Sequence, residues 1–582
     1  MRRAGFLGTL FALAGAPVVS RASASGKDAA DLIVTGAKIH TVDSAMPAAQ
    51  AFSVRGGRFA YVGSVEGAMA LRGPNTAIVD LSGSTVLPGL IDAHIHLTSV
   101  GMDLSQVDVF KLHSFEEVVA RTVAFARTSP DPWILGDGWD QNLWPGKSFP
   151  THEALSAALP DRPVALSRVD GHAVLANAKA MQIAGVDKRT PDPAGGRIVR
   201  DANGEPTGVF VDAAQGIIYG KVPEPTHDQL VRATRSAIAE CNRYGLTTVA
   251  EPGTNDVHLA AHRTLLEAGD YSIRNYAMLS DNAELIDEHL RSGPIDAAYD
   301  GRLWVRAIKM FADGALGSRG AALLAPYSDD PSNVGLVVTP GAHMQEVAER
   351  ALRAGFQVCV HAIGDRGNRI VLDAYEGALR AVPAADPRFR IEHAQVIALD
   401  DIPRFAKLGI IPSMQSTHQI SDMAWAQARL GPDRIQGAYA WRRLLDTGVI
   451  IANGTDAPVE AVSTLRTFHA AVTRQNESNV PPGGWYPDQR MTREEALKSM
   501  TIWAAHANFQ EKILGSITPG KYADFVVMDR DWLTVPPEEI MGTRIQSTYL
   551  SGKRAYDGTS TALAHRPRKR AGCCTRPATT SS

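Results

Sequence analysis

The stretch Val-Leu-Pro-Gly-Leu-Ile-Asp-Ala-His-Ile-His-Leu, residues 86 to 97, decides the interpretation of the fold. An apolar run stops at Pro88-Gly89, resumes, and ends in the pair His94 and His96. Side chains two residues apart in a strand point to the same face, so both imidazoles project from one strand end. Such a pair can bind a divalent metal, although two histidines at this spacing more often fill a core or arise by chance. The rest of the chain must therefore decide between these interpretations.

Composition sets the outer bounds. The chain has 582 residues, of which 45% are hydrophobic and 21% charged, as in ordinary globular proteins. This length allows one large α/β barrel with additions, or several smaller domains. Lys and Arg number 59 and Asp and Glu number 62, so the charge is nearly balanced. We therefore expect no nucleic-acid partner.

The N-terminus has the pattern of an export signal. Arg2-Arg3 precede an apolar segment, residues 6–19, and Ala22-Ser-Ala24 follows it. This order is typical of a secretory signal peptide over residues 1–24, and the paired arginines resemble a twin-arginine signal. The apolar segment is short for a membrane span, so we expect none in the mature chain. The sequence predicts an exported protein, periplasmic or secreted, with a cytoplasmic location as the alternative.

Two further features concern the tail and the cysteines. Residues 558–582 are rich in Ser, Thr and Ala, carry a basic run at 566–570 and lack apolar periodicity, which predicts a disordered tail. Four cysteines do not make a disulfide framework. Cys241 and Cys359 lie in apolar surroundings and are expected to be buried thiols.

Short alternating apolar segments occur at both ends of the chain. Those within residues 31–86 are cut by glycines and predict a small antiparallel sheet. Similar segments return within residues 510–556. Because chain termini commonly lie close together, we expect these two regions to form one composite β-sandwich around a central insertion.

The centre, residues 87–509, alternates strand and helix patterns. This number of β/α units favours a closed (β/α)8 TIM-type barrel over an open sheet. Residues 133–221 interrupt the rhythm with Gly, Pro and Trp, and we expect a subdomain inserted over the barrel mouth. The strands expected after the insertion are 246–251, 304–311, 356–361, 389–393, 410–415 and 449–453.

Polar residues gather where these strands end. A barrel of this type places its chemistry at the C-terminal ends of its strands. A single histidine at such a place is usually structural, but a set from five different strands is hard to obtain by chance. Imidazole and carboxylate ligands suit Zn²⁺ and also Fe, Mn or Co. The strand-end set is His94, His96, Lys309, His361, His393 and Asp456.

The ordered motifs resemble the metal-dependent amidohydrolase superfamily, and within it the amidohydrolase 3 branch, which includes N-substituted formamide deformylases. The resemblance covers roughly residues 31–555. It is specific for the superfamily and much less specific for a substrate. The motifs are Pro88-Gly-x-Ile-Asp-x-His94-x-His96, Lys309-Met-Phe-Ala-Asp313-Gly, His361-Ala-Ile-Gly-Asp365, Ile391-Glu-His393-Ala, Asn453-Gly-Thr-Asp456-Ala-Pro458 and Gly515-Ser-Ile-Thr-Pro-Gly-Lys-x-Ala-Asp524.

The resemblance implies a ligand set. His94 and His96 would bind the more buried metal together with Asp456, and His361 and His393 would bind a second one. Lys309 takes the place where related enzymes use a bridging lysine carbamate; as an ammonium it would have no lone pair for a metal. The alternative is a lysine that binds a substrate carboxylate or forms a structural ion pair, and one metal instead of two. Zinc is the expected ion, with Fe, Mn or Co as alternatives.

The resemblance also implies a small-molecule substrate and hydrolysis of a non-peptide carbon–nitrogen bond in an amide, formamide or cyclic amide. A metal lowers the pKa of its bound water and makes hydroxide available at neutral pH. Asp456 can take a proton from the attacking water and pass it to the leaving amine, which leaves poorly as an anion. The alternatives are an esterase or lactonase on the same scaffold, and a non-catalytic exported binding protein.

Weaker candidates lie around this set. Trp139 and His172 fall in the inserted segment and are predicted to line the mouth, with core packing as the alternative for the tryptophan. Arg319 and His418 are predicted substrate contacts, and either could instead face solvent. Asp365, four residues after His361, is predicted to support that ligand from behind. A homodimer is one assembly that the sequence leaves open.

Overall fold

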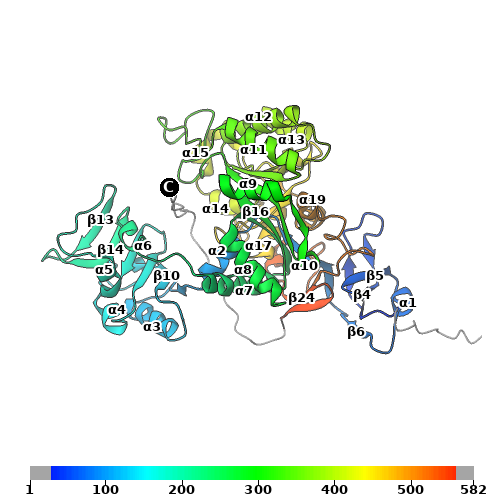
Figure 1. Cartoon of the computed structure of the whole chain (residues 1–582), viewed down its shortest axis with the longest axis horizontal. Coiled ribbons are helices and arrows are strands. Elements are labelled where there is room, and N and C mark those ends of the chain that lie inside the picture. The colour runs from blue at the N-terminus through cyan, green and yellow to red at the C-terminus, as the bar shows by residue number, and fades with distance from the viewer. Residues whose placement is uncertain (1–27, 559–582) are drawn as a thin grey trace, which may run out of the picture.

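The computed structural model describes residues 28–558, which form a central barrel flanked by two smaller β-rich parts (Figure 1). The expected signal peptide, 1–24, lies outside the described residues, as does the predicted tail beyond Gly558. None of the helices within 28–558 is long and apolar enough to cross a membrane. Cys241 and Cys359 are free and buried, as predicted.

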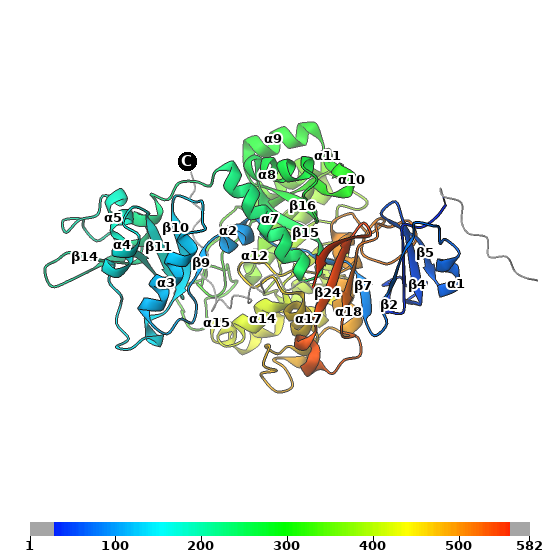
Figure 2. The ribbon, with the colours of Figure 1, turned by 90° about the horizontal axis from the view of Figure 1, so that it is seen from below.

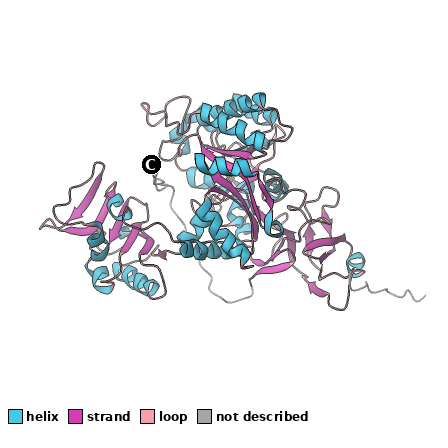
Figure 3. Cartoon of the chain, in the orientation of Figure 1, coloured by secondary structure: helices cyan, strands magenta, loops and turns pink. Residues whose placement is uncertain are grey.

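Eight parallel strands form the barrel in the order β22-β21-β20-β19-β18-β16-β15-β8. Figure 3 shows the strands of the barrel at the centre of the molecule, with helices around them. The first and last strands meet where Ala93 N donates to Asn453 O at 3.1 Å, so the barrel is nearly closed. The predicted TIM-type barrel is confirmed. Its strands are β8 (Leu90–Asp92), β15 (Leu246–Thr254), β16 (Arg274–Ser280), β18 (Leu303–Phe311), β19 (Gln357–Ala362), β20 (Arg390–His393), β21 (Ile411–Met414) and β22 (Ala452–Asn453).

Helices follow the strands and cover the barrel. Nine helices of the described residues lie in the connections from β15 to β22: α8 (Asp256–Glu267), α9 (Ala283–Ser292), the short α10 (Ala298–Gly301), α11 (Gly341–Ala354), α12 (Asp365–Ala381), α13 (Ile402–Leu408), α14 (Ser416–Asp422), α15 (Ala426–Arg434) and α16 (Trp441–Leu445). Three more follow β22 and return the chain toward the sandwich: α17 (Thr464–Thr473), α18 (Arg493–Ser499) and α19 (Ile502–Ala507).

Helix α7 (His227–Arg243) shows how the sequence sets such an element. Thr226 and Gln229 form a capping box at its start, which satisfies backbone N–H groups that a helix leaves unpaired. Buried residues recur every three or four positions and give one apolar face. That face packs against α2 (Leu97–Leu104), where a Cβ on Gly101 would lie 1.9 Å from Ala233 O. Glycine at this position therefore permits the close approach that fixes α2 behind the histidine pair.

Both chain ends build the sandwich beside the barrel, as predicted. One sheet has the order β5-β4-β1-β6 and the other the order β25-β24-β23-β7-β2-β3. Phe52 and Phe525, far apart in sequence, pack with ring centroids 5.0 Å apart between the sheets. The strands are β1 (Leu32–Thr35), β2 (Lys38–His40), β3 (Ala48–Ala49), β4 (Ala51–Arg55), β5 (Arg58–Gly63), β6 (Ala77–Asp80), β7 (Thr85–Pro88), β23 (Phe525–Met528), β24 (Ile545–Leu550) and β25 (Lys553–Asp557).

A buried ion pair joins the barrel to this sandwich. Arg274, on β16, donates from Nε and Nη2 to the two carboxylate oxygens of Asp524, at 2.6 and 2.9 Å. Both side chains are almost completely buried. Two parallel hydrogen bonds between ionised groups fix orientation as well as contact.

The inserted subdomain has its own six-stranded sheet, which begins at Val107, before the predicted start at residue 133. Figures 1 and 2 show it standing beside the barrel, next to α2 and α7. Arg232 on α7 pairs with Asp131 of the subdomain at 2.6 Å. Its strands and helices are β9 (Val107–Asp108), α3 (Phe115–Ala126), β10 (Ile134–Trp139), α4 (Glu153–Ala158), β11 (Val164–Arg168), β12 (Ala173–Ala176), α5 (Ala178–Ala184), β13 (Gly196–Arg200), β14 (Pro206–Asp212) and α6 (Gln215–Tyr219).

Candidate metal centre

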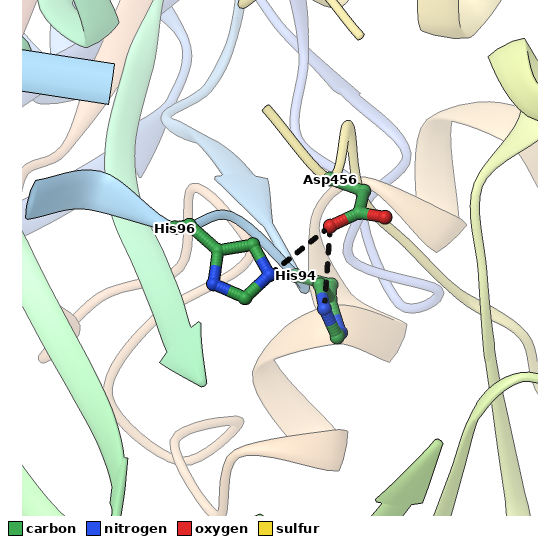
Figure 4. Close-up of side chains that lie close together, drawn as sticks. All are labelled: His94, His96 and Asp456. Atoms are coloured by element: carbon green, nitrogen blue, oxygen red, sulfur yellow. Dashed lines mark ion pairs between the residues drawn. The ribbon is translucent and has the colours of Figure 1, made fainter. Parts of the chain in front are cut away.

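Three predicted ligands meet at the end of β8. His94 Nε2 lies 3.5 Å from Asp456 Oδ1, and His96 Nε2 lies 3.3 Å from the same oxygen (Figure 4). These donor atoms all lie within 4.8 Å of one another. His94 is fully buried, whereas the side chain of His96 is 31% exposed. One metal ion could accept all three donors.

A second group shares Asp456. His393, at the end of β20, and His418, on α14, join Asp456 in a set whose donor atoms also lie within 4.8 Å of one another. His418 Nε2 is 3.4 Å from Asp456 Oδ2. His361, at the end of β19, packs its ring 4.6 Å from that of His393. Asp456 thus stands between two groups of imidazoles, one on each carboxylate oxygen.

Lys309 lies at the same end of the barrel, on β18, and is 1% exposed. Burial lowers the pKa of its amine, although the carboxylates of Glu392 and Asp456 act in the opposite direction. Its Nζ lies 4.3 Å from the centroid of the Phe311 ring, which in turn lies 5.3 Å from the ring of His361. All six predicted ligands therefore converge on one region, although they come from the ends of five different strands.

Backbone hydrogen bonds fix the two halves of the first group against each other. Asp456 N donates to His94 O at 2.7 Å, and His96 N donates to Ala457 O at 2.9 Å. Asp92 accepts from His94 N and from Thr455, and burial raises its pKa to about 7. Asp92 had no role among the residues predicted from the sequence. Its place two residues before the first histidine is a local signal, but the contact with residue 455 needed the fold.

Gly454 allows the two hydrogen-bonded segments to approach each other this closely. A Cβ on Gly454 would lie 2.5 Å from His94 N and 2.7 Å from Asp92 Oδ1, which is closer than real Cβ contacts. Asp456 and His393 themselves adopt positive φ values of 56° and 72°, a conformation that residues other than glycine seldom adopt. Strained backbone at both ligands indicates that the surrounding packing determines their direction.

Neighbouring groups hold the histidine rings. His94 Nδ1 lies 2.6 Å from Glu392 Oε2, and His393 Nδ1 lies 2.7 Å from Gln415 Oε1. His361 Nε2 lies 3.6 Å from Asp313 Oδ1, beyond hydrogen-bonding distance. The sequence analysis assigned no role to Glu392, Gln415 or Asp313. The first and last of these stand inside the quoted motifs, but only the fold shows which ring each one approaches.

The donor set fits a divalent cation. His94 Nε2, His361 Nε2 and His418 Nε2 are buried and have no hydrogen-bond partner among the described residues. Burial lowers the pKa of His94 to about 4 and that of His361 to about 3, which keeps the imidazoles neutral, as metal binding requires. Burial alone would raise the pKa of Asp456, but the nearby histidines hold it well below its usual range. Neutral nitrogens around a charged carboxylate are the donors that Zn, Fe, Mn or Co accept.

The weaker candidates have different outcomes. His418 is brought to the site, as described above. Trp139 is fully buried inside the inserted subdomain and donates from Nε1 to Leu166 O at 2.8 Å, so it packs in a core and does not line the mouth. His172 is exposed on the same subdomain and pairs with Asp212 at 2.8 Å. The structure keeps both residues in a unit that stands beside the barrel.

Arg319 and Asp365 also bond elsewhere. Arg319 pairs with Asp329 at 3.0 Å, which occupies its guanidinium. Asp365 Oδ1 accepts from Leu324 N at 2.8 Å and from Arg366 N at 2.9 Å, so its carboxylate anchors a loop. The residue beside the His361 ring is instead Asp313. The structure thus brings Asp313, rather than the predicted Asp365, nearest to the His361 ring among the contacts described here.

Comparisons with known proteins agree with this geometry. The chain is 35% identical over 554 residues to "Protein LONG AFTER FAR-RED 3" of Arabidopsis thaliana, covering 90% of this chain and 92% of that protein. It is 29% identical over 544 residues to the N-substituted formamide deformylase of Arthrobacter pascens, covering 91% and 99%. An uncharacterized metal-dependent hydrolase from Pyrococcus furiosus superposes with a TM-score of 0.73 at 29% identity, covering 86% of this chain and all of that one.

The profile described as the amidohydrolase family matches residues 77–556, which include the barrel, the inserted subdomain and the returning strands of the sandwich. The same range contains all six strand-end residues of the candidate centre. With this match and with its His-His-Asp donor set, the chain belongs to the amidohydrolase family and is a metal-dependent hydrolase of that superfamily.

Proposed function

We propose that the protein hydrolyses a non-peptide carbon–nitrogen bond in an amide, formamide or cyclic amide. The observation that carries this proposal is the position of Asp456. Its carboxylate is buried, stays charged, and has His94 and His96 beside one oxygen and His418 beside the other. A group so placed can exchange protons with a water molecule and a substrate in the same small space.

The chain's own residues then have distinct tasks. A bound divalent metal supplies Lewis acidity and lowers the pKa of water. Asp456 accepts the proton of the attacking water on a carboxylate oxygen and passes it to the nitrogen that leaves. His418, 3.4 Å from Oδ2, is placed to contact the substrate on that side. Proton delivery is essential for an amide because an amine leaves poorly as an anion.

A carbon–nitrogen bond is favoured over an ester bond by one relative. The Arthrobacter pascens protein, named as an N-substituted formamide deformylase, aligns along 99% of its own length. Esters and lactones meet the same attacking water, so they remain the alternative substrate class. The relative's name supports the proposal that this chain hydrolyses amides. A direct comparison of amide and ester substrates tests this proposal.

An exposed aromatic side chain beside the candidate metal centre indicates that the substrate carries an apolar substituent. Phe311 is 43% exposed, and its ring centroid lies 4.3 Å from Lys309 Nζ and 5.3 Å from the ring of His361. An exposed aromatic ring next to the ligands offers apolar contact to the part of a substrate that does not react. We therefore propose that the substituent on the nitrogen is uncharged and at least partly apolar.

Zinc is the proposed metal, with a carbamate on Lys309 as the proposed bridge between two ions. Export of the chain is a proposal that rests on the segment behind Arg2-Arg3, and N-terminal sequencing of the mature protein checks it. Cleavage after residue 24 supports export, whereas an intact N-terminus in the cytoplasm contradicts it.

The test compares matched substrates on purified protein of known metal content. An N-substituted formamide and the formate ester with the same substituent differ only in the leaving atom. We expect amine release from the formamide, and its loss in Asp456→Asn with the fold retained. Turnover of the ester without turnover of any amide would transfer the proposal to the esterase alternative. Absence of both, with metal bound, would favour a binding protein.

A further inference from the structure

A chain of buried charges lies behind the candidate metal centre. Glu392 Oε2 is 2.6 Å from His94 Nδ1, and Glu392 Oε1 is 2.8 Å from Arg390 Nε. All three side chains have no exposed surface. Burying a carboxylate and a guanidinium costs free energy because both groups lose their water. The proposed reaction uses neither Arg390 nor Glu392, so this pair needs another explanation.

The contact with Glu392 fixes the tautomer of His94. Glu392 Oε1 lies 2.8 Å from Arg390 Nε, and this ion pair keeps the side chain a carboxylate that can only accept a hydrogen bond. The proton of the His94 ring must then be on Nδ1. Nε2 is left with its lone pair, has no hydrogen-bond partner among the described residues, and faces Asp456 at 3.5 Å.

Arg390 holds the carboxylate and the backbone of its target together. Its Nη2 donates to Ala93 O at 2.6 Å, one residue before His94, and to Ser413 Oγ at 2.8 Å. Its Nη1 donates to Asn508 Oδ1 at 2.9 Å. The guanidinium therefore links β20 to the end of β8 and to β21, and it holds Glu392 through a second contact, from Nη2 to Oε2 at 3.0 Å.

The other side of the centre is built differently. His393 Nδ1 contacts Gln415 Oε1 at 2.7 Å, and Gln415 Nε2 donates to Ser413 O at 3.3 Å, which fixes the amide orientation. This partner is neutral. The carboxylate near His361 is Asp313, which lies beyond hydrogen-bonding distance from the ring and already accepts from three backbone N–H groups. A carboxylate thus supports one side of the centre and an amide the other.

We propose that Glu392 and Gln415 are positioning residues that make the two sides of the centre unequal in metal retention. A carboxylate behind a ligand histidine raises the basicity of the ring and fixes its direction, which an amide does less strongly. The His94 side therefore holds its metal longer than the His393 side. The inference depends on the proposed metal centre and is independent of which bond is cleaved.

The test follows metal release into a colorimetric chelator from the full metal-loaded protein, with no substrate present. Wild type is expected to lose metal in a fast and a slow phase. Glu392→Gln should accelerate the slow phase by about 10- to 100-fold, the usual effect of losing such a partner. Gln415→Glu should make the opposite change and slow the fast phase.

Asp524→Asn is the matched control. It also removes a buried carboxylate charge next to an arginine, but in the joint between barrel and sandwich, remote from the centre. We expect it to lower the thermal unfolding midpoint and to leave both release phases unchanged.

The outcomes separate positioning from general stability. If Glu392→Gln releases metal no faster than Asp524→Asn does, the inference is wrong. If Glu392→Gln fails to fold, Gln415→Glu decides alone, and an unchanged fast phase overturns the proposal. In a protein that holds one metal, the single phase must respond to Glu392→Gln. If the release phases respond to the substitutions as expected but the wild-type protein hydrolyses no amide, the proposed reaction is contradicted and this inference is not.

Discussion

Lys309→Met gives opposite results under the two interpretations of this lysine. Methionine keeps much of the length and removes the charge of a side chain that is 1% exposed. If Lys309 carries a carbamate, the variant loses an anionic bridge, and metal content should fall from about two to about one ion per chain or less. If it is an ammonium, the variant loses a repelling charge and should bind metal more tightly.

The size of the second effect follows from electrostatics. Two unit charges about 4 Å apart at an effective dielectric constant of about 20 interact by about 4 kcal/mol, so an ammonium opposes a divalent ion by about 8 kcal/mol. Even a quarter of that energy, about 2 kcal/mol, changes a dissociation constant by more than about tenfold. The two interpretations therefore differ in sign by a margin that elemental analysis and metal titration can measure.

Carbon dioxide supplies a further distinction. Only a neutral amine can form a carbamate, and burial lowers the pKa of Lys309, which increases the neutral fraction at a given pH. Added bicarbonate should raise metal uptake by the wild-type apoprotein and have no effect on Lys309→Met. Lys521→Met is the matched control, because burial also lowers the pKa of Lys521 but its Nζ donates to Leu514 O outside the centre.

The result that would refute the carbamate is specific. Tighter metal binding in Lys309→Met, together with no bicarbonate effect on the wild type, would identify an ammonium. Lys309 would then be assigned to a substrate carboxylate or to an ion pair, and one metal would be expected in place of two.

Other substitutions test other parts of the site. Asp456→Asn should lower kcat by about 10²- to 10⁴-fold, as expected for a lost proton-transfer group, in steady-state assays at measured metal content. Gly454→Ala should lower the free energy of unfolding by about 1–3 kcal/mol in denaturant titrations, because the new Cβ meets the His94 backbone. Phe311→Ala should raise KM about fivefold for apolar substrates, from about 1 kcal/mol of lost burial, and leave an unsubstituted formamide unaffected. Chelation should abolish turnover and added divalent metal restore it; full activity of the metal-free protein would contradict the metal-dependent mechanism.

The sequence alone was sufficient for the barrel and the candidate ligands because both are recorded in local patterns. Apolar runs of strand length followed by helical periodicity predict β/α units, and parallel strands bring their C-terminal ends to one edge. His94, Lys309, His361, His393 and Asp456 follow or close such runs, so their convergence could be inferred without knowing a contact. The returning strands at the C-terminus were recognisable for the same reason.

Only the tertiary structure decided which groups support those ligands. Glu392 and His393 are neighbours in sequence, yet the carboxylate contacts His94, almost three hundred residues away. Asp365 follows His361 closely but bonds to a loop, and Trp139 is closed into a core. Side-chain direction at a strand end depends on backbone twist, packing and long-range hydrogen bonds. Periodicity indicates which residues reach the same end of the barrel, whereas packing determines what each one contacts there.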